Sequence, residues 1–208
     1  MSSENSDYPY TTGGPLLVVL SGPSGVGKDA TLGVLRTLER PWHFAVTATT
    51  RAKRPAERGG KAYIFLETEK FQKMVGQGEF LEYAQVYGNW YGVPKEQIRH
   101  ARKEGLDTIL KVDVQGAATI KALVPDAVFI FLVPSSIEEL QRRLSLRATE
   151  SAGDLEVRTG IARQEMERMS SFDYVVVNRD GCLDQSVTCI DAIILAERCR
   201  TSPRQISI

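Results

Sequence analysis

Residues 16–32 read LLVVLSGPSGVGKDATL, and this stretch decides the fold of the chain. Its first five residues are all apolar, as in a strand that is buried on both faces of a sheet. Glycines then allow backbone turns that side chains would block, and Lys28 stands where a helical pattern begins. Strand, glycine loop and helix with the spacing GxxxxGK are typical of a phosphate-binding P-loop.

Anion binding is the physical purpose of such a loop. Its backbone N–H groups and those of the following helix converge, and the lysine adds a full positive charge, so a polyphosphate is the expected guest. The bland alternative is a glycine-rich turn that only joins a strand to a helix, but the complete spacing and both flanks favour phosphate. The predicted phosphate-binding residues are Gly22, Pro23, Ser24, Gly25, Val26, Gly27, Lys28, Asp29 and Ala30.

Asp29 departs from the P-loop pattern, which has Ser or Thr as a magnesium ligand after the lysine. An acid in the first turn of a helix is favoured by the helix dipole, which would make the residue structural. A carboxylate can also face a magnesium ion, which would make it functional. Both explanations stay open, so Asp29 is a candidate metal ligand. Thr31 offers a nearby hydroxyl in a slightly different register.

Composition sets the broad class. The chain has 208 residues, 42% of them hydrophobic and 25% charged, which suits one α/β domain with small insertions. Its formal net charge of +0 gives no bulk attraction to nucleic acid or to a membrane, and no apolar run is long enough to span a bilayer. The polar residues 1–14 predict a disordered tail without signal-peptide features. Three cysteines without metal-type spacing predict free thiols in the cytoplasm.

Strands and helices alternate through most of the chain, which predicts a parallel sheet with crossover helices. We expect a five-stranded parallel core sheet flanked by helices, formed by residues 15–46 and 95–200. Beside the first strand, apolar runs predict strands over 41–46, 107–113, 127–133 and 174–178. Apolar periodicity predicts helices over 30–35, 95–104, 115–123, 137–146, 155–169 and 183–200. Residues 201–208 are expected to form a C-terminal tail.

Residues 47–94 predict an inserted lobe of mixed β and α structure. Short strands are expected over 62–65, 79–87 and 89–93, with a helix over 69–77. The polar stretch 47–60 contains a proline and paired glycines, which predict a loop, and its arginines make it locally basic. Such a loop is either solvated or a clamp for an acceptor phosphate, because arginine forks match phosphate oxygens.

A second arginine-rich segment lies near the C-terminus. Arg142, Arg143 and Arg147 cluster there, and residues 147–158 predict a short lid. A P-loop, a basic clamp and a mobile cationic segment are the parts that phosphoryl transfer needs, since the donor and acceptor must be positioned, charge neutralised and water excluded. A phosphate acceptor needs no general base, because its second pKa is about 6 and its oxygen is already anionic.

Five stretches together resemble the guanylate kinases: GPSGVGKD, TATTRAKRPAERGGKAYIF, FLEYAQVYGNWYGVP, KVDVQG and RRLSLRATE…VR. The resemblance covers nearly the whole chain. It implies a P-loop kinase with a GMP-binding lobe and a lid, which uses ATP and Mg²⁺ to phosphorylate GMP, and also dGMP, to GDP in purine nucleotide metabolism. It implies ATP and GMP as the partners, in a monomer or weak homo-oligomer.

The resemblance also implies residue roles. Glu82 would read guanine, because a carboxylate accepts from N1–H and the 2-amino group together, and adenine lacks both donors on that edge. The implied catalytic residues are Lys28, Arg143, Arg147 and Arg158. The implied GMP-binding residues are Thr47, Arg51, Arg54, Glu57, Tyr63, Glu82, Tyr91 and Asp113. Taken singly, each could be structural, as a packing tyrosine or an exposed charge, and we expect Arg142 to be an exposed charge.

Some positions depart from the family pattern, and two rival functions remain. Val93 stands where many members carry a hydroxyl that can donate to guanine O6, and Ala56 and Ala62 replace a common glycine and a common aspartate. One rival is a P-loop kinase of another small phosphorylated substrate, although such an acceptor would need no base-reading Glu82. The other is an inactive guanylate kinase-like interaction module.

Overall fold

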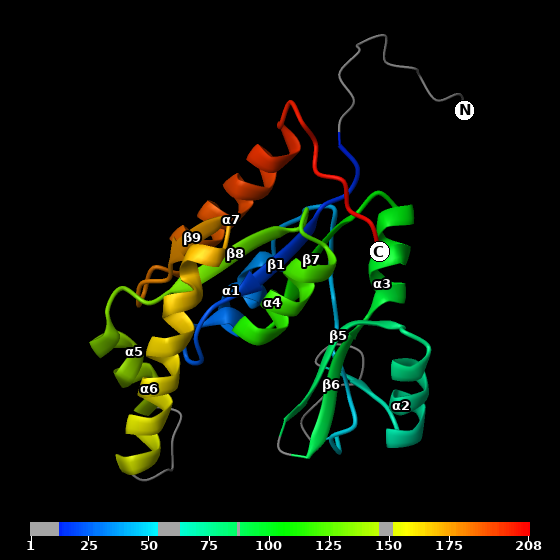
Figure 1. Ribbon diagram of the computed structural model, residues 1–208. Coiled ribbons are helices and arrows are strands. Elements are labelled where there is room, and N and C mark those ends of the chain that lie inside the picture. The colour runs from blue at the N-terminus through cyan, green and yellow to red at the C-terminus, as the bar shows by residue number, and fades with distance from the viewer. Residues whose placement is uncertain (1–12, 54–62, 87, 146–151) are drawn as a thin grey trace.

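A five-stranded parallel sheet forms the centre of the molecule (Figure 1). The computed structural model of the chain describes residues 13–53, 63–86, 88–145 and 152–208, with side chains from 156 onward in the last range. The strands follow the order β2-β7-β1-β8-β9, and every neighbouring pair is parallel, which confirms the predicted core sheet. They are β1 (Leu17–Ser21), β2 (Trp42–Phe44), β7 (Asp107–Lys111), β8 (Val128–Val133) and β9 (Tyr174–Val177).

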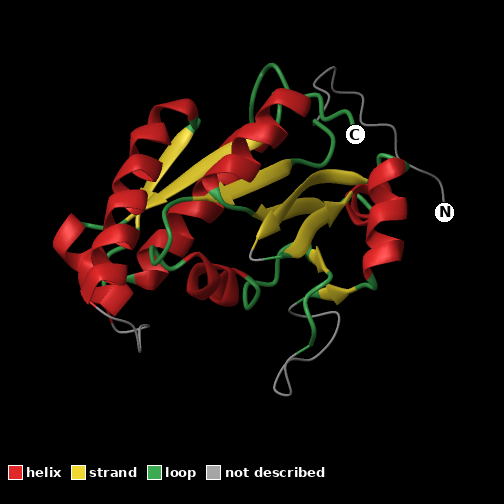
Figure 2. Cartoon of the chain, turned by 60° about the horizontal axis from the view of Figure 1, so that its bottom comes forward, coloured by secondary structure: helices red, strands yellow, loops and turns green. Residues whose placement is uncertain are grey.

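Helices cover both faces of this sheet (Figure 2). Their ends lie within a few residues of the predicted ones, since caps and first turns are the hardest positions to place from sequence. The 3₁₀ helix Arg168–Ser171 extends the long helix that was predicted over 155–169. The α-helices are α1 (Lys28–Leu35), α3 (Lys95–Lys103), α4 (Val114–Leu123), α5 (Ile137–Ser145), α6 (Ala152–Glu167) and α7 (Leu183–Arg198).

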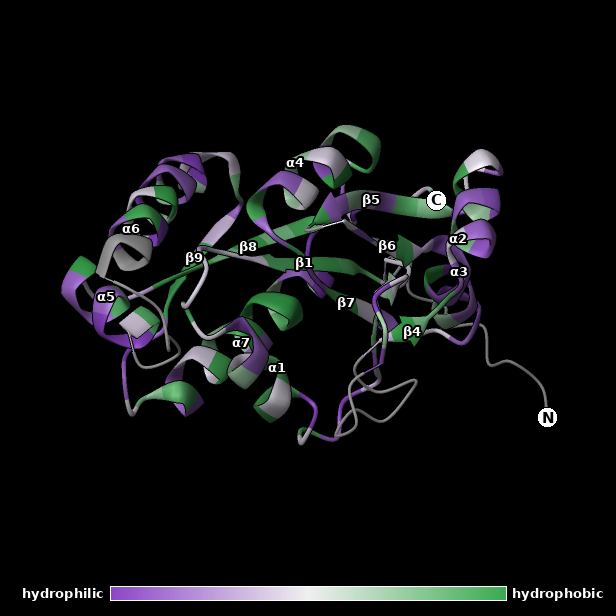
Figure 3. Ribbon diagram, turned by 90° about the horizontal axis from the view of Figure 1, so that it is seen from below, coloured by the Kyte–Doolittle hydropathy of each residue, from purple (hydrophilic) through white to green (hydrophobic). Residues whose placement is uncertain are grey.

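The central strand builds two hydrophobic cores at once, because side chains alternate between the faces of a strand. Leu16, Val18 and Leu20 pack toward α1 and α7 on one face. Leu17 and Val19 pack toward α3 and α4 on the other. Figure 3 shows β1 and β8 as apolar strands between helices that carry polar residues on their outer sides. A continuous apolar run is therefore what this position in the sheet requires.

The inserted lobe has its own four-stranded mixed sheet, in the order β4-β3-β6-β5. The strand β3 pairs parallel with β4 and antiparallel with β6, although the sequence predicted a loop over 47–60. Phe71 and Phe80 stack in its small core with their ring centroids 4.3 Å apart. The elements are β3 (Ala48–Thr49), β4 (Ile64–Phe65), α2 (Thr68–Gly76), β5 (Phe80–Val86) and β6 (Asn89–Pro94).

Residues 201–208, expected to be a tail, pack against the core domain. Ile206 is buried in the core on the α3 and α4 face. Arg204 pairs with the fully buried side chain of Glu197 and donates to the carbonyl of Ala127. The C-terminal segment is therefore an integral part of the core domain.

The N-terminal residues 1–12 lie outside the described part of the chain, as do residues 146–151, which include the first half of the predicted lid. In the ranges that the structure covers, no helix has the length and apolar character needed to cross a membrane. The three cysteines carry free thiols, as predicted.

Candidate active site

A cavity of about 640 Å³ lies where the core sheet meets the inserted lobe. Its walls come from α1, the carboxyl end of β7 and the strands β5 and β6 of the lobe. The carboxyl edge of a parallel sheet is where ligands usually bind. The fold thus brings together residues that the sequence assigned to donor and acceptor sites. The predicted site residues in its lining are Lys28, Asp29, Thr47, Tyr63, Glu82, Tyr91 and Asp113.

The P-loop is held in a conformation that only glycine adopts easily. Gly27 caps α1 with a φ of +99°, and a Cβ built there would lie 2.5 Å from Nδ2 of Asn178. Gly22 has a φ of +145°, and its Cβ would lie 2.4 Å from the carbonyl oxygen of Leu132 on β8. The glycine spacing therefore reflects both backbone conformation and close packing against the neighbouring strand ends.

Lys28 folds back over the loop. Its Nζ donates to the carbonyl oxygens of Gly22, at 2.5 Å, and Pro23, at 3.1 Å. Burial lowers the pKa of Lys28, with a smaller contribution from Lys111, whereas the carboxylates of Glu165, Asp113 and Asp29 oppose this change. A phosphate bound at the loop would add a further negative charge beside this amine and would favour its protonated form.

A carboxylate from α6 already occupies an anion-binding position of the loop. Oε2 of Glu165 accepts a hydrogen bond from the backbone N–H of Ser24 at 3.1 Å. This contact shows that the loop amides can hold a negatively charged oxygen. Arg158 lies on the same helix and is half-buried. Arg147, which the sequence placed in the lid, lies outside the described residues.

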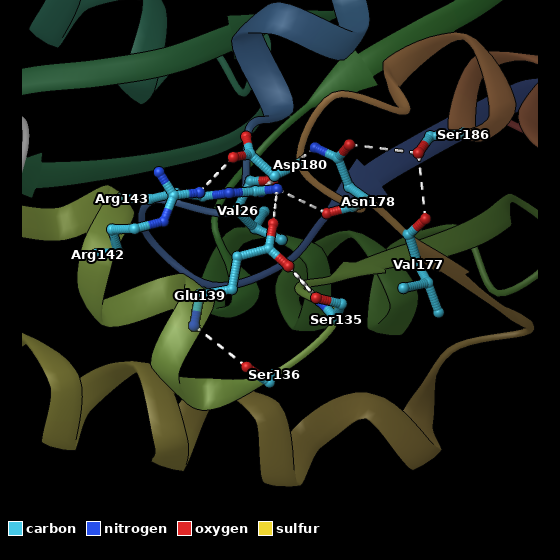
Figure 4. A network of polar contacts seen from close by, with 10 residues as sticks. All are labelled: Val26, Ser135, Ser136, Glu139, Arg142, Arg143, Val177, Asn178, Asp180 and Ser186. Atoms are coloured by element: carbon cyan, nitrogen blue, oxygen red, sulfur yellow. Dashed lines mark hydrogen bonds and ion pairs between the residues drawn. The ribbon is translucent and has the colours of Figure 1, made fainter.

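Arg143 contacts the backbone of the P-loop in this structure (Figure 4). Its Nη1 donates to the carbonyl oxygen of Val26 at 3.0 Å, and its Nη2 donates to that of Asn178 at 2.9 Å and pairs with Glu139. The expected position, over the transferring phosphoryl group, is not the one observed. Its catalytic role stays a prediction, and the contacts seen here are structural.

Asn178 is a site residue that the sequence reasoning missed. It follows β9, is 4% exposed, and its Nδ2 donates to the carbonyl oxygen of Val26 at 2.7 Å. Its Oδ1 accepts a second, longer hydrogen bond from the hydroxyl of Ser186 at 3.3 Å (Figure 4). The available signal was an amide side chain at the carboxyl end of an apolar strand, which is the edge of the sheet where the P-loop lies. Arg142, by contrast, is an exposed charge paired with Asp180, as expected.

Glu82 and Asp113 face each other across Gly116 in the acceptor half of the cavity. A Cβ on Gly116 would lie 3.3 Å from Oε2 of Glu82 and 3.2 Å from Oδ1 of Asp113. Burial, and then the charge of Asp113, raise the pKa of Glu82 to about 7. Asp113 also caps α4, because its Oδ1 accepts from the N–H of Gly116 at 2.7 Å. Glu82 is thus a partly buried carboxylate whose charged form is disfavoured without a ligand.

Two tyrosines and an arginine form the lobe side of the site. The rings of Tyr63 and Tyr91 meet edge to face with centroids 6.0 Å apart, and both line the cavity. The guanidinium of Arg51 lies 5.5 Å from the Tyr63 ring centroid and donates to the carbonyl of Ala52. Thr47 also lines the cavity. Arg54 and Glu57 lie outside the described residues.

Val93 and Thr31, the two positions where the sequence raised the question of a ligand-binding hydroxyl, are both buried and do not line the cavity. Val93 is fully buried in the core with Leu81 and Ile98, and it does not line the cavity. Thr31 is also fully buried, and its hydroxyl donates to the carbonyl of Gly27 at 3.1 Å within α1. Thr31 therefore does not supply the P-loop hydroxyl, and Asp29 alone occupies that position.

The carboxylates at the cavity suit a divalent cation that arrives with a nucleotide. Asp29 and Asp113 line the cavity beside Lys28, and oxygen atoms are the ligands that Mg²⁺ prefers. Within the described ranges, no group of three His, Cys, Asp or Glu residues could hold a metal ion by itself. This donor set fits a cation that is bound by one or two carboxylates, water and substrate phosphates.

A family model described as guanylate kinase matches residues 15–197. The chain belongs to the guanylate kinase family. It is 48% identical over 195 residues to "Guanylate kinase 2, chloroplastic/mitochondrial" of Oryza sativa subsp. japonica, with 93% of this chain and 68% of that protein covered. It is 43% identical over 185 residues to the guanylate kinase of Caldanaerobacter subterraneus subsp. tengcongensis, with 89% of each covered.

A solved guanylate kinase has the same fold. The crystal structure of guanylate kinase from Anaplasma phagocytophilum matches with a TM-score of 0.70 and 31% identity, over 91% of this chain and 89% of that one. Membership of the guanylate kinase family confirms the resemblance inferred from the five sequence stretches, and the matched range includes both the P-loop and the inserted lobe. The roles of individual guanylate kinase residues in this chain stay predictions.

Proposed function

We propose that this chain transfers the γ-phosphoryl group of ATP to GMP and releases ADP and GDP. The observation that carries the proposal is the shared cavity: the P-loop lysine, Lys28, and the partly buried carboxylate of Glu82 line the same space of about 640 Å³. A donor phosphate at Lys28 and a guanine at Glu82 would place the two substrates in one enclosure, as direct transfer requires. Family membership supports the same activity.

Glu82 supplies the base selectivity in this proposal. Its carboxylate accepts two hydrogen bonds from the N1–H and 2-amino groups of guanine, and these bonds favour the charged form of a group whose pKa is about 7 without ligand. Adenine offers neither donor on that edge, so its binding would leave a buried carboxylate without a partner. A site built in this way discriminates strongly between the two bases.

The acceptor phosphate is held by the lobe. Tyr63 and Tyr91 line the cavity, the guanidinium of Arg51 lies beside the Tyr63 ring, and each of the three can donate to phosphate oxygens. We assign Arg54 and Glu57 to this site from the family resemblance. At neutral pH the phosphate is already largely a dianion, since its second pKa is about 6, so no residue has to remove a proton.

The donor site uses Lys28 and the loop amides for the β- and γ-phosphates, and Arg147 and Arg158 for closure. We propose Mg²⁺ as the divalent cation, which neutralises charge on the phosphates when it is bound. Asp29 and Asp113 are the carboxylates that would hold it. We also propose dGMP as an acceptor, whereas the cytoplasmic location and the monomeric or weakly oligomeric state stay predictions.

The test is an ADP-release assay with ATP and Mg²⁺ that compares GMP, AMP, UMP, CMP and no acceptor. We expect turnover with GMP alone. The Lys28→Ala variant should lose most of kcat while its GMP affinity, measured by calorimetry, is kept. Faster turnover on a non-guanine acceptor would favour the rival kinase, and GMP binding without turnover would favour an inactive interaction module.

Glu82→Gln isolates the base-reading step. The amide keeps the shape of the side chain but presents an N–H₂ group to a guanine donor, so GMP binding should weaken by about 2–5 kcal/mol, the range for losing a buried charged contact. An equal loss for every acceptor would mean that Glu82 only supports the lobe. Glu79→Gln, at an exposed carboxylate just before β5, is the matched control.

A further inference from the structure

At the phosphate side of the cavity, an ion pair joins the end of strand β7 to the start of helix α1. Lys111 is the last residue of β7 and lies in register with Leu20 of β1, next to the start of the P-loop. Asp29 lies in the first turn of α1. Nζ of Lys111 lies 2.5 Å from Oδ1 of Asp29, although the residues are 82 positions apart in the chain.

The location of this pair sets it apart from an ordinary surface contact. Both side chains line the cavity together with Lys28, and 71% of the Asp29 side chain is exposed. A carboxylate here lies where the negative charges of a nucleotide polyphosphate would arrive, and like charges repel. The usual P-loop has a neutral hydroxyl at this position, so the repulsion is a consequence of Asp29.

We propose that Lys111 is a positioning residue of the donor site, which balances the charge of Asp29 and holds its carboxylate beside the incoming phosphates. The inference rests on the ATP-dependent function proposed above. Asp29 and Lys111 together form a neutral unit in the place of the missing hydroxyl. The arrangement keeps the carboxylate at the cavity, where a divalent cation would arrive with the phosphates, and it lowers the repulsion between Asp29 and the nucleotide when no cation is present.

A purely structural pair makes different predictions. Exposed ion pairs contribute little to folding stability, and an acid in a first helical turn acts through the helix dipole. In that case, removing Lys111 would change the urea midpoint slightly and leave nucleotide binding alone. In our proposal, nucleotide binding changes, and the change depends on which residue occupies position 29.

The experiment is a double-mutant cycle. Calorimetry measures how tightly each protein binds a non-hydrolysable ATP analogue in the absence of GMP. The four proteins are the parent, Asp29→Ser, Lys111→Met and the double variant. Asp29→Ser restores the usual hydroxyl, and Lys111→Met removes the charge while keeping a long side chain. Each titration is run once in EDTA and once in excess Mg²⁺.

We expect Lys111→Met to weaken binding about tenfold in the parent background in EDTA, and less in Mg²⁺, because the cation then also covers the charge of Asp29. In the Asp29→Ser background the same change should cost less than about threefold. Lys111→Arg should keep the parent affinity. An equal loss in both backgrounds, or no loss in either, would overturn the proposal, since Lys111 would then act without Asp29.

Controls separate this inference from its neighbours. Urea unfolding of each variant reports folding, and Lys111→Gln replaces Lys111→Met if the latter does not fold. If the parent releases no ADP with GMP, the proposed function has failed. If the parent does so but the binding cycle is additive, only the role of Lys111 has failed.

Discussion

Glu82 shows how one buried carboxylate couples base recognition to folding stability. Its folded-state pKa is about 7, whereas the ordinary value is 4.5. Between these values the folded chain binds more protons than the unfolded chain, so the contribution of Glu82 to stability is present at low pH and is lost as the pH rises. Asp113 is the charged group that faces it and adds to the shift. At neutral pH the carboxyl of Glu82 is therefore only partly ionised, and its ionisation destabilises the ligand-free chain.

Glu82→Gln should remove this destabilisation, because the amide does not ionise. At about pH 8 the ligand-free variant should be more stable than the parent by about 1–3 kcal/mol, and near pH 5 the difference should almost vanish. Urea unfolding at the two pH values measures the change. The exposed Glu79→Gln variant, measured at the same two pH values, is the control. A constant difference at both pH values would contradict the assignment of the raised pKa to Glu82.

The site could be predicted residue by residue only where a short motif carries the geometry. Lys28 follows from GxxxxGK because loop and helix are contiguous in sequence. Asp29 and Lys111 meet only through the pairing of β1 with β7, so neither residue by itself predicts their contact. Arg143 was assigned to the phosphoryl group, but its observed partners on the loop and near β9 become neighbours only in the folded chain.

The P-loop is an element whose shape depends on parts of the chain far from it. Asn178 and Arg143 both donate to the carbonyl oxygen of Val26, and Glu165 accepts from the amide of Ser24. The loop is therefore held by Arg143 of α5, by Glu165 of α6 and by Asn178, which follows β9. Backbone groups that must converge on a phosphate are fixed in this way before the nucleotide arrives, which reduces the ordering cost of binding.

Asn178→Ala should separate loop positioning from general stability. It removes the bond to Val26, so we expect a loss of about 1–3 kcal/mol in the free energy of unfolding together with weaker ATP binding. Ser186→Ala is the matched control, because its hydroxyl contacts Asn178 and Val177 but not the loop. The control should lose stability with ATP affinity kept, as measured by urea unfolding and calorimetry. Parallel losses of ATP affinity would contradict a specific role for Asn178.

Elements were predictable where periodicity was strong and neighbours were sequential. The five core strands are apolar runs that alternate with helices, and this pattern is sufficient for a parallel sheet. The strand β3 is only two residues long, lies in a polar stretch and is stabilised by β4 and β6 on its two sides. Its formation is a tertiary effect, which local propensity does not report.

At the scale of the whole molecule, the C-terminal segment completes the core domain. Arg204 forms two hydrogen bonds of 2.7 Å with the carboxylate of Glu197, whose side chain is fully buried, and it also pairs with Asp173. Tyr174 donates to the same carboxylate at 2.6 Å. The hydrogen bonds from Arg204, and after them the bond from Tyr174, lower the pKa of Glu197 despite its burial.

Arg204→Ala should destabilise the whole domain by about 3–5 kcal/mol, because it leaves Glu197 buried without its cation. Arg200→Ala is the control: Arg200 is 48% exposed and lies 3.7 Å from the same carboxylate, so its loss should cost less than about 1 kcal/mol. Urea unfolding of both variants measures the difference. Similar losses would show that the 201–208 segment does not stabilise the core through Arg204.

The packing of Ile206 into the hydrophobic core on the α3 and α4 face of the sheet also has a consequence for biosynthesis. A protein emerges from the ribosome from its N-terminus, and its domains fold as units during synthesis. Here the core on the α3 and α4 face includes Ile206, so that face stays incomplete until residue 206 has left the exit tunnel. Until then, the part of that core which Ile206 covers stays exposed on the nascent chain.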